Sequence, residues 1–367
     1  LIKPLSQAIA DGDHVYATIL GSAMNHDGHT FGYSVPNPIA QAEVVAAALV
    51  DAGVTSDTIT YVEAHGTGTS LGDPLEIHGL ADAFGVDAAR TSRCAIGSVK
   101  SNIGHAEAAA GIAQVHKVVL QLTHRTLVPT LPHAARLNPK IDFEQAGFHV
   151  QCALCPWPNS ETGTPRRAGV SSFGAGGVNV HLILEEAPEL SGSPKSHEDA
   201  PALLVLSART DSALRAAASR LADHLRNKDL TDNLDSIAWT LQSGRRSLKH
   251  RLAAVTHDPL SAADALERFA ADGQANGIVR VADGSGRGSI GAAMEKPTKN
   301  DDAVDLALIR ELAEEWLQGG DPNWRRLYPH GSPVRVPLPT YPFERESYWI
   351  VNPFKESTPP SANPVTT

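Results

Sequence analysis

The sequence predicts a layered α/β domain followed by a smaller α+β domain. Three observations carry this prediction. Strand-like and helix-like stretches alternate up to about residue 187, a polar stretch with prolines occupies 188–200, and a shorter mixture of strands and helices follows at 201–330. Alternation of this kind is typical of a layered α/β architecture. A chain of 367 residues with 42% hydrophobic and 20% charged residues has room for two modest domains.

The elements of the first domain, residues 1–187, follow from hydrophobic periodicity and turn residues. Asp73 is expected to be the N-cap of its second helix, with Pro74 as the first helical residue. The pattern predicts strands at 14–24, 58–65, 94–100 and 147–154, helices at 38–53, 73–85 and 106–124, and two closing strands joined by a glycine turn within 168–187.

The second domain, residues 201–330, follows a linker at 188–200 and is expected to be small. Prolines and aromatic residues in VRVPLPTYPFERESYWI, residues 334–350, exclude a regular helix there. The composition of residues 354–367 predicts a disordered tail. Within this part, the pattern predicts strands at 201–208 and 250–257 and helices at 210–227, 234–244 and 305–320.

Composition excludes several classes of function. The formal net charge of −10 argues against a binder of duplex nucleic acid. No apolar run approaches the ~18 residues that a membrane span needs, and the first residues lack the features of a signal peptide, so a cytoplasmic protein is expected. Cys152 and Cys155 form a lone C-x-x-C in the predicted strand at 147–154. Without further ligands nearby, they are interpreted as two half-buried strand cysteines and not as a metal site.

Two histidines stand in settings that indicate an active site. His65 precedes G-T-G-T in YVEAHGTGTSLGDPLE, and His105 ends the N-I-G-H of VKSNIGHAEAAAG, five residues after Lys100. The glycine spacing differs from a dinucleotide-binding fingerprint, and neither histidine lies in an H-x-x-x-H pair, which disfavours nucleotide and metal sites. Two imidazoles can stabilise a developing enolate as hydrogen-bond donors, so thioester chemistry is favoured.

Four blocks of the sequence resemble one family closely. EAHGTGTSLGDPLE, GSVKSNIGHAEAAAG and SSFGAGGVNVHLILEE are similar, in order and spacing, to the C-terminal half of the ketosynthase domain of modular polyketide synthases. GSAMNHDGHTFGYSVPNP resembles the form found in synthases whose acyltransferase is a separate protein. The resemblance implies the C-terminal half of a thiolase-like αβαβα fold, then a flanking subdomain and an extended strap, residues 331–353, that packs back on the ketosynthase.

The resemblance also implies the reaction and its partners. Family members perform a decarboxylative Claisen condensation between an acyl-cysteine and a malonyl unit on an acyl carrier protein. None of the three cysteines has the family's nucleophile context, so that cysteine is expected in an N-terminal half. The implied partners are a carrier protein bearing phosphopantetheine, a trans-acting acyltransferase and a second copy of the chain in a homodimer. The resemblance implies no metal and no directly bound cofactor. Only about 130 residues separate Glu186 from the closing segment, too few for a catalytic acyltransferase.

The family roles transfer to matching positions of this sequence. His65 and His105 would donate to the thioester carbonyl oxygen, Lys100 would tune them electrostatically, and Glu107 would belong to the same network. An ordinary structural role stays open for each of these residues.

The predicted binding residues surround the same motifs. Thr67 and Thr69 would contact the phosphopantetheine arm, and Phe173 would gate the acyl-binding cysteine. A turn role for the threonines and a packing role for Phe173 stay open, and His181 is expected to be a buried structural histidine. Two other functions also remain: a non-catalytic docking or scaffold segment, and an atypical ketosynthase for branching or chain transfer.

Overall fold

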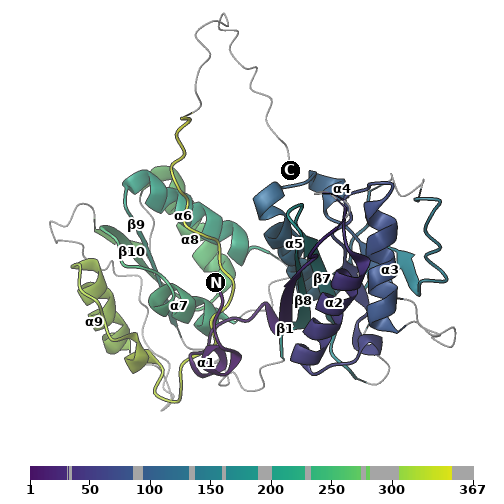
Figure 1. Ribbon diagram of the computed structural model, residues 1–367. Coiled ribbons are helices and arrows are strands. Elements are labelled where there is room, and N and C mark those ends of the chain that lie inside the picture. The colour runs from purple at the N-terminus through teal and green to yellow at the C-terminus, as the bar shows by residue number, and fades with distance from the viewer. Residues whose placement is uncertain are drawn as a thin grey trace, which may run out of the picture. The chain divides into compact units, whose positions relative to one another are not determined.

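A computed structural model describes residues 1–30, 32, 35–85, 94–131, 137–158, 163–188, 201–227, 233–273, 278–281 and 306–348. The chain divides into two compact units, Leu1–Ser191 and Gly192–Thr367 (Figure 1). The predicted linker from residue 189 onward and the predicted disordered tail lie outside the described residues, so the proposed domain limits stay predictions.

The first unit is built on a six-stranded mixed sheet with the order β1-β8-β7-β2-β3-β5. The strands β1, β8 and β7 are antiparallel, whereas β7, β2, β3 and β5 run parallel. A short ladder joins β4 (Thr126–Leu127) to β6 (Cys155–Pro156). The strands of the sheet are β1 Ala17–His26, β2 Tyr61–Glu63, β3 Cys94–Gly97, β5 Phe148–Val150, β7 Arg167–Phe173 and β8 Val178–Glu186.

Helices cover both faces of this sheet (Figure 1). Successive strand residues point to opposite faces, so Val62 packs with α2 and α3 whereas Tyr61 packs with α5. Asn37 caps α2 by accepting from the main chain of Ile39, and Pro38 begins the helix. The helical segments are α1 Leu5–Ala10, α2 Pro38–Ala52, η1 Ser56–Thr58, α3 Gly72–Phe84, α4 Lys100–Ile103, η2 Glu107–Ala109 and α5 Ala110–His124.

Helix α5 presents a mixed face to the sheet, because buried polar side chains lie there beside the apolar Val118 and Leu122. Gln114, Lys117 and Gln121 are buried, whereas Ile112 and Leu120 are exposed. The amide of Gln114 donates to the carbonyl of Ala64, just after β2, at 2.7 Å and to that of Ser171 in β7 at 2.9 Å. Buried polar groups of this kind are tolerated because they satisfy main-chain groups that the sheet leaves open.

Gly21 in β1 is required by the approach of α2. A Cβ built at this position would lie 2.7 Å from the carbonyl oxygen of Ala48 and would also meet the main chain of Ala52. Because backbone atoms cannot move aside, Gly21→Ala is expected to lower the free energy of unfolding by about 3 kcal/mol in urea denaturation. Gly176→Ala is the matched control, since nothing lies within 4 Å of its Cβ position. Equal stability of both variants would contradict the expectation.

The second unit is a small α+β fold. Its sheet has the order β11-β10-β9 and is antiparallel. Thr210 caps α6 by accepting from the main chain of Ala213, as its position in the sequence predicts. The elements are β9 Ala202–Ala208, α6 Asp211–Leu225, α7 Leu234–Ser243, β10 His250–Thr256, α8 Pro259–Asp272, β11 Ile278–Val281, α9 Leu306–Leu317 and η4 Trp324–Leu327.

Residues 331–348 contain no regular helix or strand, in agreement with their prolines. Leu338 is buried in the core of the second unit, and the main chain of Val336 donates to Thr240 Oγ1 at 2.9 Å. The predicted packing of this strap on the first unit stays a prediction.

Three predictions about local structure are wrong. Helix α3 begins at Gly72, and Asp73 does not cap it: its carboxylate instead accepts from the main chain of Gly68 at 3.1 Å. The predicted strand at 147–154 ends at Val150, which leaves Cys152 exposed and Cys155 half-buried in β6. The predicted strand at 94–100 ends at Gly97, because the chain turns into α4 at Lys100.

Candidate active site

The C-terminal ends of three adjacent strands bring two predicted catalytic residues and one predicted binding residue together. His65 follows β2, Lys100 begins α4 after β3, and Phe173 ends β7. These strands are parallel neighbours in the sheet, so their carboxyl ends meet at one edge. Ligands in α/β proteins bind at this edge, where the loops converge.

His65 is the centre of the cluster. Its ring centroid lies 5.6 Å from that of His105 and 5.8 Å from that of Phe173. Its Nδ1 accepts from the main-chain N–H of Phe173 at 3.3 Å, and Lys100 Nζ lies 3.5 Å from the same nitrogen. Because Nδ1 accepts a hydrogen bond, the neutral ring carries its proton on Nε2.

His105 is held in a similar way by its own turn. Its Nδ1 accepts from the main-chain N–H of Glu107 at 2.9 Å. Gly104 and Glu107 both adopt positive φ angles, 78° and 48°, which fold the chain back over the ring. His105 therefore also has its Nε2–H available as a donor.

Burial, together with neighbouring groups, keeps His65 neutral. Burial lowers the pKa of His65 to about 4, assisted by Lys100 and His105. Burial also lowers the pKa of Lys100, while the carboxylates of Glu76 and Glu63 raise it again. At neutral pH the cluster thus offers an uncharged imidazole beside the Lys100 side chain.

The low pKa of His65 predicts an unusual pH profile for its chemical modification. Diethyl pyrocarbonate reacts with neutral imidazole, so carbethoxylation of His65 is expected to be nearly constant from roughly pH 5.5 to 8. N-acetylhistidine, with an ordinary pKa of about 6.5, should slow severalfold over the same range as pH falls. Peptide mapping by mass spectrometry measures both rates. A parallel decline of the two would contradict the assignment of a neutral His65.

Glu76, which the sequence analysis did not select, fixes the loop that carries His65. Its buried carboxylate accepts from the main chain of His65 at 2.7 Å and of Gly66 at 2.9 Å. Burial raises the pKa of Glu76 to about 7, against the opposing effect of the two N–H groups. The signal in the sequence was the acidic residue on the helix directly after the loop.

The predicted binding residues lie around the same loop. Thr67 and Thr69 are exposed, and Thr69 Oγ1 accepts from the main chain of Gly72 at 3.0 Å. Phe173 is buried beside His65, and the side chain of Glu107 is exposed. Their functional roles stay predictions.

A cavity of about 500 Å³ opens beside this loop. Its lining combines polar groups of the loop with apolar side chains of the sheet and of the segment after residue 136. The lining includes Gly66, Gly68, Glu76, Ser98, Ile96 and Phe143.

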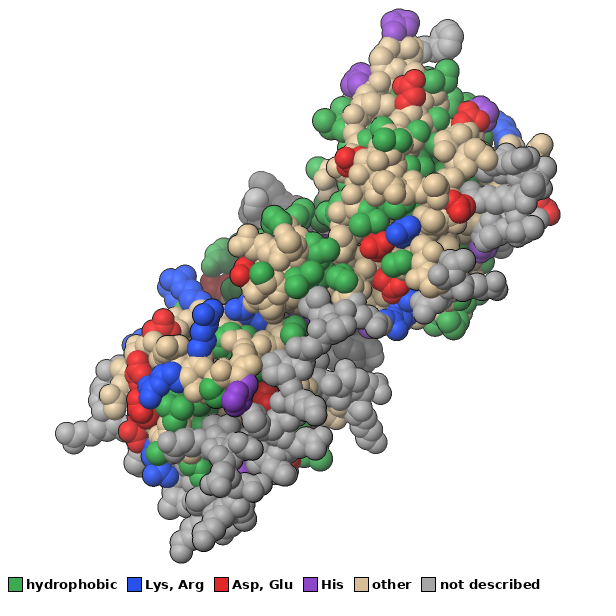
Figure 2. Space-filling view, turned by 90° about the horizontal axis from the view of Figure 1, so that it is seen from below, with side chains coloured by type: hydrophobic (Ala, Val, Ile, Leu, Met, Phe, Trp, Pro, Cys, Tyr) green, Lys and Arg blue, Asp and Glu red, His purple; other side chains and the backbone are tan. Residues whose placement is uncertain are grey.

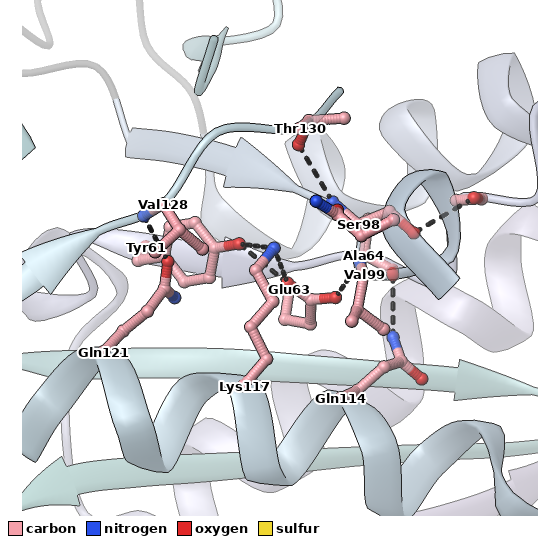
Figure 3. Close-up of polar contacts among 12 residues, drawn as sticks. Tyr61, Glu63, Ala64, Ser98, Val99, Gln114, Lys117, Gln121, Val128 and Thr130 are labelled. Carbon is pink, nitrogen blue, oxygen red and sulfur yellow. Dashed lines mark hydrogen bonds and ion pairs between the residues drawn. The ribbon is translucent and has the colours of Figure 1, made fainter. Parts of the chain in front are cut away.

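A buried polar network lies directly beneath the loop. Glu63 bonds to Tyr61, Val99 and Lys117, and Gln114 reaches the main chain of Ala64 (Figure 3). The sequence analysis missed all of these side chains. It correctly placed His181 as a buried structural histidine: Ser171 Oγ lies 3.0 Å from its Nδ1, and burial lowers its pKa to about 3.

The described residues offer neither a metal site nor a membrane-spanning helix. There, no group of three or more His, Cys, Asp or Glu side chains is arranged to hold a metal ion. No helix within the described ranges is long and apolar enough to cross a membrane. Acidic and basic side chains are interspersed on the face shown in Figure 2.

Known proteins resemble the chain along most of its length. The family described as "Beta-ketoacyl synthase, C-terminal domain" matches residues 16–134, and "Ketoacyl-synthetase C-terminal extension" matches residues 138–255. Polyketide synthase PksL of Bacillus subtilis (strain 168) is 44% identical over 95% of this chain, which spans 8% of PksL. Polyketide synthase ThaG of Burkholderia thailandensis is 45% identical over 96% of this chain, which spans 6% of ThaG.

Solved structures of ketosynthases share the fold. The oxazolomycin ketosynthase domain OzmH KS7 of Streptomyces albus JA3453 is 42% identical, with a TM-score of 0.79 over 94% of this chain and 56% of its own. The ketosynthase from module 6 of the bacillaene synthase of Bacillus subtilis 168 is 36% identical, with a TM-score of 0.80 over 95% of this chain and 61% of its own. The chain thus belongs to the ketosynthase family of polyketide synthases, and it carries the C-terminal half of their thiolase-like fold together with the extension that follows.

Proposed function

We propose that this site, in the complete protein, catalyses chain extension by decarboxylative Claisen condensation. The observation that carries the proposal is the pair of imidazoles, His65 and His105, with ring centroids 5.6 Å apart. A main-chain N–H occupies the Nδ1 of each ring, which leaves two Nε2–H donors for one substrate oxygen.

The chemistry follows from these two donors. A malonyl thioester loses CO₂ when the electron pair of the breaking C–C bond moves onto the thioester carbonyl oxygen as an enolate. Both Nε2–H groups would donate to that oxygen as its charge develops, which lowers the barrier in a partly buried site. The enolate carbon then attacks the acyl-cysteine carbonyl, and the cysteine thiolate leaves.

The nucleophilic cysteine is proposed to lie in an N-terminal ketosynthase half. Cys94, Cys152 and Cys155 lack the sequence context of that nucleophile, and the solved relatives extend well beyond the part that this chain covers. A malonyl unit would arrive on the phosphopantetheine arm of an acyl carrier protein. The exposure of Thr67 and Thr69 beside His65 supports this route. No cofactor is proposed to bind this chain directly.

A separate acyltransferase is proposed to load the carrier protein. The second unit supports this, because its described part is a three-stranded sheet with a few helices, too small for a catalytic acyltransferase. A homodimer is proposed from the family resemblance.

The test is a reconstituted reaction with the complete protein, a malonyl-carrier protein and an acyl thioester donor. The expected result is release of CO₂ and a 3-ketoacyl-carrier protein, both followed by mass spectrometry. Acyl transfer without CO₂ would instead indicate a chain-transferring ketosynthase. If neither CO₂ release nor acyl transfer occurs, the result would indicate a docking or scaffold segment.

A further inference from the structure

Glu63 is the last residue of β2, and its side chain is fully buried. A buried carboxylate costs several kcal/mol unless it is paired and hydrogen-bonded. Both of its oxygens are occupied: Oε1 accepts from the main chain of Val99 at 2.6 Å, and Oε2 accepts from Lys117 Nζ and the Tyr61 hydroxyl, each at 2.7 Å (Figure 3). The network therefore joins two strands and a helix.

Stability alone does not explain this ion pair. Replacing a buried ion pair by apolar side chains of similar size is often neutral or stabilising. The bond with a direct geometric consequence for the site is the one from Glu63 to Val99, because it crosses from the end of one strand to the end of its neighbour.

The bond from Glu63 to Val99 fixes the main chain next to two site residues, His65 and Lys100. Glu63 pairs with Gly97 across the parallel strands β2 and β3, and Val99 lies two residues further on. Val99 is the N-cap of α4 and directly precedes Lys100, while His65 follows Glu63 by two residues. One carboxylate oxygen thus joins the two points from which the Lys100 and His65 side chains leave the sheet.

The charge of Glu63 acts on the same pair. Lys100 is half-buried, and the carboxylate of Glu63 is one of two that raise its pKa against the effect of burial. Lys100 in turn lowers the pKa of His65. Glu63 therefore affects the His65 imidazole through Lys100 in two ways, by its position and by its charge.

We propose that Glu63 is a positioning residue, which sets the separation of the His65 imidazole from the Lys100 ammonium by holding Val99 against the end of β2. Lys117 and Tyr61 orient the carboxylate for this contact. The inference rests on the proposed decarboxylation, because it assigns Glu63 an effect on two residues that act in that step.

The sharpest test removes the hydrogen-bond donor that Glu63 accepts from. Val99 has φ −63° and ψ −22°, a conformation that proline adopts, so Val99→Pro deletes the N–H that Glu63 accepts and keeps the charges. Val99→Ala is the matched control, because it keeps the N–H. In the complete ketosynthase, Val99→Pro is expected to lower kcat for malonyl-carrier decarboxylation by about 100-fold with little change in KM, since small displacements in a site cost about this much. Equal kcat in both variants would overturn the proposal.

A second pair of variants separates position from charge. Glu63→Gln/Lys117→Met and Glu63→Leu/Lys117→Met both remove the buried charges, but only the first keeps an oxygen that accepts from Val99. The glutamine variant is expected to regain most of the rate that the leucine variant loses. If both double variants lose the same share of the decarboxylation rate, the effect belongs to the charge of Glu63. If both keep the full rate, Glu63 has no effect on the reaction. Either result overturns the positioning role.

A readout that does not need decarboxylation keeps the two proposals distinguishable. The carbethoxylation rate of His65 at pH 7 reports its environment, and thermal unfolding reports stability. Val99→Pro is expected to change the carbethoxylation rate relative to Val99→Ala, even if the wild-type protein releases no CO₂. An unchanged rate with a lowered melting temperature would mean a structural role only, and would overturn the inference.

Discussion

His105→Ala in the complete ketosynthase is expected to slow malonyl-thioester decarboxylation by about 100-fold or more, and His65→Ala by a similar factor. Each imidazole has its Nδ1 occupied by a main-chain N–H, at 2.9 Å for His105 and 3.3 Å for His65. Each therefore contributes one Nε2–H donor to the enolate oxygen, and alanine removes it. The rate of CO₂ release from malonyl-carrier protein measures the effect.

Glutamine provides the control for donor loss. His105→Gln places an amide N–H near the position of the imidazole Nε2–H, so it is expected to recover part of the rate. Because His105 is exposed, its alanine variant should unfold at the same temperature as the wild type. Full activity of both alanine variants would refute the assignment of the imidazoles as donors.

Between pH 5 and 8, the free energy of unfolding of the wild type should fall by about 3 kcal/mol relative to that of Glu76→Gln. Burial raises the pKa of Glu76 from 4.5 to about 7, so the folded state keeps a proton that the unfolded state has released. The stability from this group is thus fully present below pH 4.5 and is lost as pH rises through 7. Urea denaturation of both proteins at several pH values measures the difference.

The same comparison tests the loop geometry. In the wild type the carboxylate of Glu76 accepts from His65 and Gly66, whereas a glutamine has one acceptor for the two N–H groups. At pH 5, however, folded Glu76 keeps its proton, so its acid group has one carbonyl acceptor, as the glutamine amide has. The two proteins are therefore expected to be similarly stable at pH 5, and the wild type less stable than Glu76→Gln at pH 8. A stability difference that is independent of pH would show that Glu76 ionises normally in the folded protein.

Short-range patterns predicted most elements and the histidine pair. The spacing of apolar residues located α2 and α6, and the motifs around His65 and His105 located the site, because these features depend on neighbours in sequence. Helix α8 was missed, although Asp258 caps it and Pro259 begins it, both of which are readable signals.

The supporting residues of the site could not be predicted from local patterns. Glu63 meets Val99 and Lys117 across 36 and 54 positions of sequence, so only the sheet order brings them together. Asp73 was misassigned as a cap because its position before a proline fits that role, whereas the turn at Gly68 takes its carboxylate. Composition does not say which of two compatible hydrogen-bond donors lies closer in space.

The buried polar side chains of α5 have a consequence for how uniquely the first unit folds. An apolar helix face can slide along a sheet with little penalty, but Gln114, Lys117 and Gln121 each match one particular group of the sheet or of the loop beside it. A shift by one turn, ~5.4 Å, would leave these groups unpaired at a cost of about 1–3 kcal/mol each. The helix is consequently restricted to one alignment on the sheet. The strand ends next to His65, Lys100 and Phe173 are therefore also held in one arrangement.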